Sequence, residues 1–134
     1  MYVLSFPYHA IAEKRIALVC GNSSYLHSGS LKNPVNDARG ISDALEELDF
    51  TVIRAIDLAK PQMDRQIAAF SKRLKSADIA IFFYAGHGIQ LNMKNYLVPI
   101  DFDPQAQTYL NDQLVGMDTI LHELEKEKRI SIIF

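Results

Sequence analysis

The segment Ile79-Ala-Ile-Phe-Phe-Tyr84, which runs directly into Ala85-Gly86-His87-Gly88, gives the clearest indication of the fold class of this chain. A continuous apolar run of this length is typical of a central strand in a parallel sheet, where both faces of the strand are buried. Open α/β sheets bind ligands beyond the carboxyl ends of such strands, and His87 stands at that end. The glycines leave room for a substrate backbone, and the Gly88 amide is free to point at a developing oxyanion. The pattern suits a catalytic imidazole, with a structural loop histidine as the alternative from this stretch alone.

Apolar patterns on both sides of this segment predict alternating strands and helices. Short apolar runs predict strands at 16–20, 50–56, 77–84 and 130–134. Helical spacing predicts helices at 33–49, 61–75 and 114–127, with a short extended piece at 96–100 and a polar loop at 101–111. The alternation predicts a doubly wound, mostly parallel α/β sheet with right-handed crossovers.

The composition describes one globular domain. The chain has 134 residues, of which 49% are hydrophobic and 22% charged, and a net charge of -2. This balance gives no electrostatic reason to expect a nucleic acid or an anionic membrane as partner. No segment approaches the ~18 consecutive apolar residues that a membrane span requires.

The first twelve residues differ in character from the rest, because they are almost uncharged and rich in aromatic side chains. Ala10-Ile11-Ala12 has the small-x-small form of a signal-peptidase site, although no basic region precedes it. We expect residues 1–12 to be the remnant of a targeting segment or a disordered arm, and the domain to span 13–134. Two locations are therefore alternatives for this protein, the cytoplasm or an exported, periplasmic location.

Three separated blocks of sequence resemble one family. They are Arg15-Ile-Ala-Leu-Val-Cys-Gly-Asn-Ser-Ser-Tyr25, Leu31-Lys-Asn-Pro-Val-Asn-Asp-Ala-Arg39, and Phe83-Tyr-Ala-Gly-His-Gly-Ile-Gln90 followed by Tyr96-Leu-Val-Pro99. In this order and spacing they resemble the caspase-like cysteine peptidases of bacteria, the orthocaspase and metacaspase group. The resemblance implies the caspase-hemoglobinase fold, with a strand order starting 2-1-3-4. It also implies a Cys/His dyad at the carboxyl ends of the third and fourth strands, and a peptide or protein substrate.

The resemblance gives roles to three residues. His87 matches the dyad histidine, which partners a thiolate and then protonates the leaving amine. Gly88 would supply an oxyanion-hole amide. Asp37 matches the carboxylate with which metacaspases hold an Arg or Lys side chain just before the scissile bond, and a carboxylate pairs naturally with a guanidinium. The implied activity is endopeptidase cleavage after Arg or Lys. Without the resemblance, Asp37 reads as a first-turn aspartate favoured by the helix dipole.

The nucleophilic cysteine of the implied dyad is expected just beyond the chain as given. In caspase-type enzymes it follows the histidine by about 50 residues, which points to a position about three or four residues past Phe134. Cys20 is a poor substitute, because it belongs to the first strand, and we expect a buried thiol with a raised pKa. The chain would then be the amino-terminal part of a catalytic domain, truncated in its fourth strand and inactive alone.

An alternative remains for the same residues. The chain could be a non-catalytic interaction module that pairs through the edge of its fourth strand, as a homodimer or with a full-length relative.

The sequence gives little support for a metal site. His9, His27 and His122 share no metal-ligand spacing. Asp101, Asp103 and Asp112 fall where related metacaspases bind calcium, an ion that prefers such hard oxygen ligands. Loop aspartates also commonly form turns, so calcium is a candidate and no cofactor is required.

Overall fold

The computed structural model describes residues 13–126 and 130–133. The elements in chain order are β1 (Arg15–Gly21), α1 (Pro34–Glu47), β2 (Thr51–Ile56), α2 (Lys60–Leu74), β3 (Ile79–Ala85), β4 (Gly88–Leu91), β5 (Lys94–Leu97), α3 (Leu110–Gln113), β6 (Val115–Gly116), α4 (Met117–Glu125) and β7 (Ile130–Ile133). The leader expected at 1–12 and the end of the fourth predicted strand at 134 lie outside the described residues. No helix in the described ranges has the length and apolar character needed to cross a bilayer.

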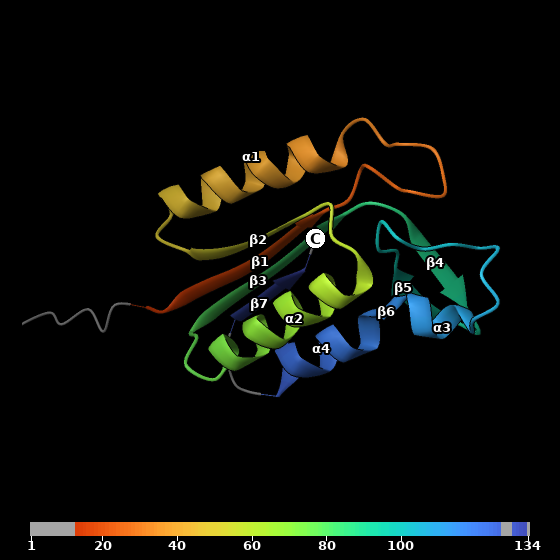
Figure 1. The fold of residues 1–134 in the computed structure, drawn as a ribbon. Coiled ribbons are helices and arrows are strands. Elements are labelled where there is room, and N and C mark those ends of the chain that lie inside the picture. Colours follow the sequence, from red (N-terminus) through yellow and green to blue (C-terminus); the bar gives the residue numbers. More distant parts are fainter. Residues whose placement is uncertain (1–12, 127–129, 134) are drawn as a thin grey trace, which may run out of the picture.

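The main sheet has four parallel strands in the order β2-β1-β3-β7. The helix α1 covers one face of this sheet, and α2 and α4 cover the other (Figure 1). Since β7 is the fourth strand of this sheet along the chain, the predicted doubly wound architecture and the order 2-1-3-4 are confirmed.

Burial on both faces explains why the apolar runs became central strands. In β1, Ala17, Leu18 and Val19 have no exposed surface, and Phe82 of β3 is 1% exposed. Each large side chain buried in this way stabilises the fold by about 1.5–3 kcal/mol. The strands therefore form the structural frame from which the loops of the site extend.

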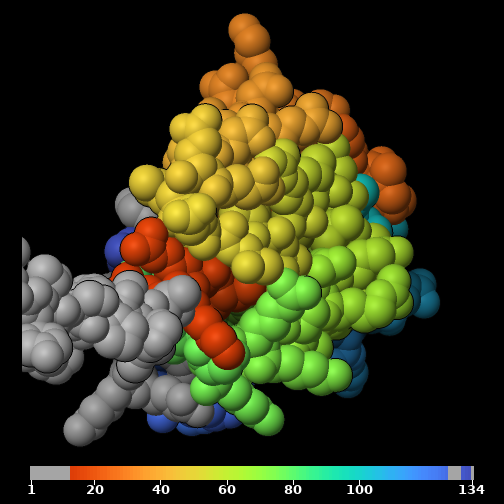
Figure 2. Space-filling model, turned by 90° about the vertical axis from the view of Figure 1, so that its left-hand side faces the viewer, coloured from red at the N-terminus to blue at the C-terminus, as the bar shows by residue number. Residues whose placement is uncertain are grey.

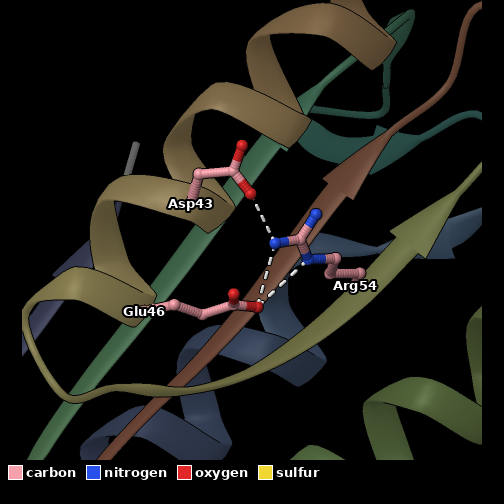
Figure 3. A network of polar contacts seen from close by, with 3 residues as sticks. All are labelled: Asp43, Glu46 and Arg54. Atoms are coloured by element: carbon pink, nitrogen blue, oxygen red, sulfur yellow. Dashed lines mark hydrogen bonds and ion pairs between the residues drawn. The ribbon is translucent and has the colours of Figure 1, made fainter.

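The two long helices bury the faces that their sequences predict. In α2, Met63, Phe70 and Leu74 are buried against the sheet. In α1, proline occupies the first helical position, where its missing N–H costs nothing. Arg54 of β2 also pairs with two carboxylates of α1, Asp43 and Glu46, on the surface (Figure 3).

Two chain connections lie at the end of the molecule at which β1 begins. Figure 2 shows this end, where the α1–β2 and α2–β3 connections flank the start of β1. The strands of the parallel sheet all run away from this end, so the loops that follow β1 and β3 gather at the opposite edge.

A second, antiparallel sheet in the order β4-β5-β6 was not expected from the sequence. Its strands have four, four and two residues, too short for a clear alternating pattern. The hairpin between β4 and β5 turns at Asn92 and Met93, which both have positive φ angles, as in a type I′ turn. The sequence has methionine where such turns usually have glycine, so the turn was overlooked.

The prediction of a helix over 114–127 was wrong at its start. Leu114 and Val115 are buried, but Val115 pairs with Leu97 in the small sheet, and α4 begins only at Met117. The predicted loop at 101–111 also contains the start of α3. Apolar spacing could not reveal this, because the same buried side chains serve a strand pairing instead of a helix face.

Candidate functional site

The loops that follow β1 and β3 start side by side at the carboxyl edge of the main sheet. Gly21 at the end of β1 is in register with Ala85 at the end of β3. The next residue, Asn22, donates its backbone N–H to the carbonyl of Ala85 at 2.9 Å. This pairing brings the loop of residues 22–33 next to the segment that carries His87.

His87 is half-buried, and its backbone is bound on both sides. Its N–H donates to the hydroxyl of Tyr25 at 2.7 Å, and its carbonyl accepts from the hydroxyl of Tyr84 at 2.6 Å. The same carbonyl accepts from the N–H of Val98 at 3.1 Å. The imidazole lies against the Tyr25 ring, with 4.6 Å between ring centroids and 45° between planes. The histidine therefore occupies a defined position.

A cavity of about 260 Å³ adjoins the histidine. It is lined by Ser28, His87, Gly88, Ile89, Val98, Phe102 and Pro104. Most of these side chains are apolar, and His87 brings the one titratable side chain among them. The cavity thus offers a hydrophobic surface beside a proton donor and acceptor.

The backbone amide of Gly88 points away from the neighbouring strand. Gly88 pairs with Leu97 in the β4–β5 ladder, and the bond from Val98 N–H to His87 O lies just outside that pair. This arrangement marks a non-hydrogen-bonded antiparallel pair, in which the amides of the pair face outward. Because β4 is an edge strand, the Gly88 N–H is directed off the sheet.

The two glycines beside His87 serve different purposes. Gly86 has a φ of +157°, and a Cβ there would lie 2.6 Å from the Tyr84 hydroxyl and 2.8 Å from the Tyr25 hydroxyl. A Cβ at Gly88 would meet only the Tyr96 carbonyl, at an ordinary 3.6 Å. Packing therefore requires glycine at 86, whereas at 88 it leaves an open approach to the backbone.

Cys20 lies in the core and is 2% exposed, as expected. Burial raises the pKa of its thiol to about 12, so the nucleophilic thiolate form is suppressed at neutral pH. Cys20 is a packing residue of the main sheet and not half of a dyad.

Asp37 is exposed on the first turn of α1. The helix starts at the same carboxyl edge as the His87 segment. Its first turn lies against Gly21 at the end of β1, where an added Cβ would lie 2.6 Å from both the Pro34 carbonyl oxygen and the Ala38 Cβ. Asp37 does not line the cavity beside His87. It is thus a free carboxylate at the edge where His87 lies.

The calcium candidates lie in separate surroundings. The carboxylate of Asp101 accepts the backbone N–H of Lys60 at 2.9 Å and so caps the start of α2. Asp103 accepts the N–H of Gln105 in a turn, and Asp112 is exposed in α3. In the described part of the chain, no three His, Cys, Asp or Glu side chains come together as metal ligands.

No pattern in the sequence indicated a role for Tyr25, Tyr84 or Asp57. Tyr25 closes the first block of the family resemblance and Tyr84 belongs to the third, which is the only signal they gave. The contact of Tyr25 with His87 depends on the pairing of β1 with β3 and could not be read from local pattern. Tyr84 lies only three residues before His87, but no sequence pattern shows that its hydroxyl turns back to the His87 carbonyl.

Comparison with known proteins gives relatives among animal proteins. The chain is 28% identical over 123 residues to the mucosa-associated lymphoid tissue lymphoma translocation protein 1 of human and to its mouse homologue. The match covers 91% of this chain but only 15% of the human and 14% of the mouse protein. The chain therefore spans a small part of the length of these relatives.

Comparison with solved structures supports the fold. The crystal structure of the Drosophila initiator caspase Dronc matches with a TM-score of 0.65 and 12% sequence identity, over 88% of this chain and 47% of that one. Residues 14–133 match the sequence model of the family described as the caspase domain. The chain belongs to this caspase-domain family of cysteine peptidases.

Proposed function

We propose that this chain is the histidine-bearing part of a cysteine endopeptidase domain that cleaves peptide bonds after Arg or Lys. The observation that supports this best is the position of His87, at the carboxyl end of a central strand, beside an open cavity and an outward-facing amide. The metacaspase-like specificity rests on Asp37 and on the sequence resemblance.

The strand register supports a nucleophile in the segment that follows β7. The parallel pair β3–β7 aligns Phe82 with Ile133. His87 lies five residues after Phe82, so the aligned position lies five residues after Ile133. Neighbouring strands are about 4.8 Å apart, so a side chain there would come within reach of His87. This position agrees with the cysteine spacing of caspase-type enzymes, about 50 residues after the histidine.

The proposed chemistry is acyl transfer through a thiolate. The thiolate attacks the carbonyl carbon before the scissile bond, and the amide of Gly88 stabilises the oxyanion that forms. The His87 imidazolium gives its proton to the leaving amine as the C–N bond breaks. His87 then takes a proton from water, which attacks the thioester and releases the acid and the thiolate.

The test uses the full-length protein to which this domain belongs, with fluorogenic peptides that end in Arg, Lys or Asp. Cleavage of the Arg and Lys peptides is expected, and His87→Ala should lower kcat by roughly 10³-fold or more. His122→Ala on the exposed face of α4 is the matched control and should leave kcat unchanged. Full activity in the His87→Ala protein would refute the proposal.

A further inference from the structure

Two tyrosine hydroxyls enclose the backbone of His87. The His87 N–H donates to Tyr25 Oη at 2.7 Å, and Tyr84 Oη donates to the His87 carbonyl at 2.6 Å. The two hydroxyl oxygens are 3.4 Å apart. The tyrosines come from separate elements, since Tyr84 belongs to β3 and Tyr25 to the loop after β1.

The protons in this group fix the direction of each hydrogen bond. Each phenol carries a single proton. The proton of Tyr84 goes to the His87 carbonyl, which is much closer than its other acceptor, the Val98 carbonyl at 3.3 Å. Tyr25 accepts from His87, so its own proton is left for Tyr84. The bonds form a closed ring that runs from His87 N–H through Tyr25 and Tyr84 to His87 C=O.

Both hydroxyls keep their protons over the working range of a thiol peptidase. Burial raises the pKa of Tyr84 and of Tyr25, and the negative charge of Asp57 raises that of Tyr25 further. Ionisation, which would remove a donor from the ring, is thus displaced to higher pH.

The loop that carries Tyr25 is anchored before and after this residue. The carboxylate of Asp57 accepts the backbone N–H groups of Ser23 and Ser24, at 2.7 and 3.0 Å. The N–H of Leu26 donates to the Ile100 carbonyl at 2.9 Å. These bonds fix the loop on both sides of Tyr25, and they therefore hold its hydroxyl at a defined position in the hydrogen-bonded ring.

We propose that Tyr25 is a positioning residue for His87, with Tyr84 completing the hydrogen-bonded ring. Its hydroxyl fixes the His87 backbone, and its aromatic ring limits the orientation of the imidazole through the 4.6 Å contact. The inference rests on the proposed function, in which His87 must align with a thiolate and a leaving amine. A misplacement of about 1 Å in such an arrangement costs roughly 10²-fold in rate.

The activity test compares Tyr25→Phe with Tyr109→Phe in the full-length protein. The first change keeps the aromatic ring and removes the hydroxyl, whereas Tyr109 is 85% exposed and serves as the matched control. Tyr25→Phe is expected to lower kcat roughly 10- to 100-fold while KM stays within about twofold. An unchanged kcat, or a change confined to KM, would overturn the positioning role.

Hydrogen exchange separates this inference from the peptidase proposal. The His87 amide donates to the Tyr25 hydroxyl, so Tyr25→Phe should speed its exchange at least about tenfold, and Tyr109→Phe should not. A wild-type protein that cleaves no peptide overturns the proposed function, while exchange still reports on the ring. Equal exchange in all three proteins overturns the ring itself. If Tyr25→Phe does not fold, Tyr84→Phe takes its place in the activity measurement, because it removes the donor to the His87 carbonyl and leaves the Tyr25 acceptor of the His87 N–H in place. An unchanged kcat in that variant would overturn the ring.

Discussion

Cys20 lies on β1 and His87 lies just past the end of the neighbouring strand β3, yet their surroundings make them opposite in chemistry. Cys20 is in register with Tyr84, only three residues before His87. The thiol is enclosed by the core beneath α2, whereas the imidazole stands past the strand end beside a cavity. Proximity to a strand end by itself does not make a catalytic group, because exposure to substrate and a suitable pKa are also needed.

Cys20 should be unreactive in the folded protein. We expect iodoacetamide at pH 8 to leave it unmodified, and to modify it after unfolding in urea, as read by mass spectrometry of the Cys20 peptide. The raised pKa also makes stability depend on pH. Between about pH 9 and pH 12 the unfolded chain loses the thiol proton and the folded chain keeps it, so the free energy of unfolding falls. Rapid alkylation of Cys20 in the folded protein at pH 8 would show that its thiol is accessible and not buried.

Asp37 gives a prediction about specificity. If its carboxylate holds the basic side chain before the scissile bond, Asp37→Ala should lower kcat/KM on Arg and Lys peptides by roughly 10- to 100-fold. Glu47→Ala, a second exposed carboxylate at the far end of α1, is the control and should have no effect. An equal loss on acidic, basic and neutral peptides would show that Asp37 is only a structural residue of the helix.

In the β4–β5 hairpin, one turn residue is poorly suited to its backbone conformation. Met93 is held at a φ of +65° in the turn and is 92% exposed, so it has a strained backbone and almost no packing. Met93→Gly should therefore stabilise the domain by roughly 1 kcal/mol in urea unfolding. Met93→Ala, which removes the same side chain but keeps a Cβ, should bring no such gain. A loss of stability in the glycine variant would mean that the methionine packs usefully.

The loops of the candidate site extend from strands of the main sheet that are packed on both faces. The Tyr25 loop follows β1, the His87 segment follows β3, and cores lie on the α1 face and on the α2 and α4 face. Because these parts share strands, the site and the fold should be lost together. In urea, the loss of peptidase activity and of far-UV circular dichroism should follow one transition. Activity lost at clearly lower urea would show that the site opens independently.

Local sequence patterns were enough to predict the main sheet and its two long helices. Local apolar runs were sufficient for the strands of the main sheet, and helical spacing for α1 and α2, because side-chain burial repeats with the period of each element. The glycines around His87 also marked the strand end that carries the candidate site. Local pattern failed at the β4–β5 hairpin and at the start of the third predicted helix. The strands there are so short that their buried residues show no recognisable alternation.

The surroundings of His87 became visible only in the folded chain. Tyr25 is 62 residues away in sequence and reaches the histidine because β1 and β3 are paired in register. The direction of the Gly88 amide likewise depends on its pairing with Leu97 across the hairpin. The contact of Tyr25 with His87 arises from long-range strand neighbours, whose choice is set by the packing of the complete sheet and not by any short stretch of the chain.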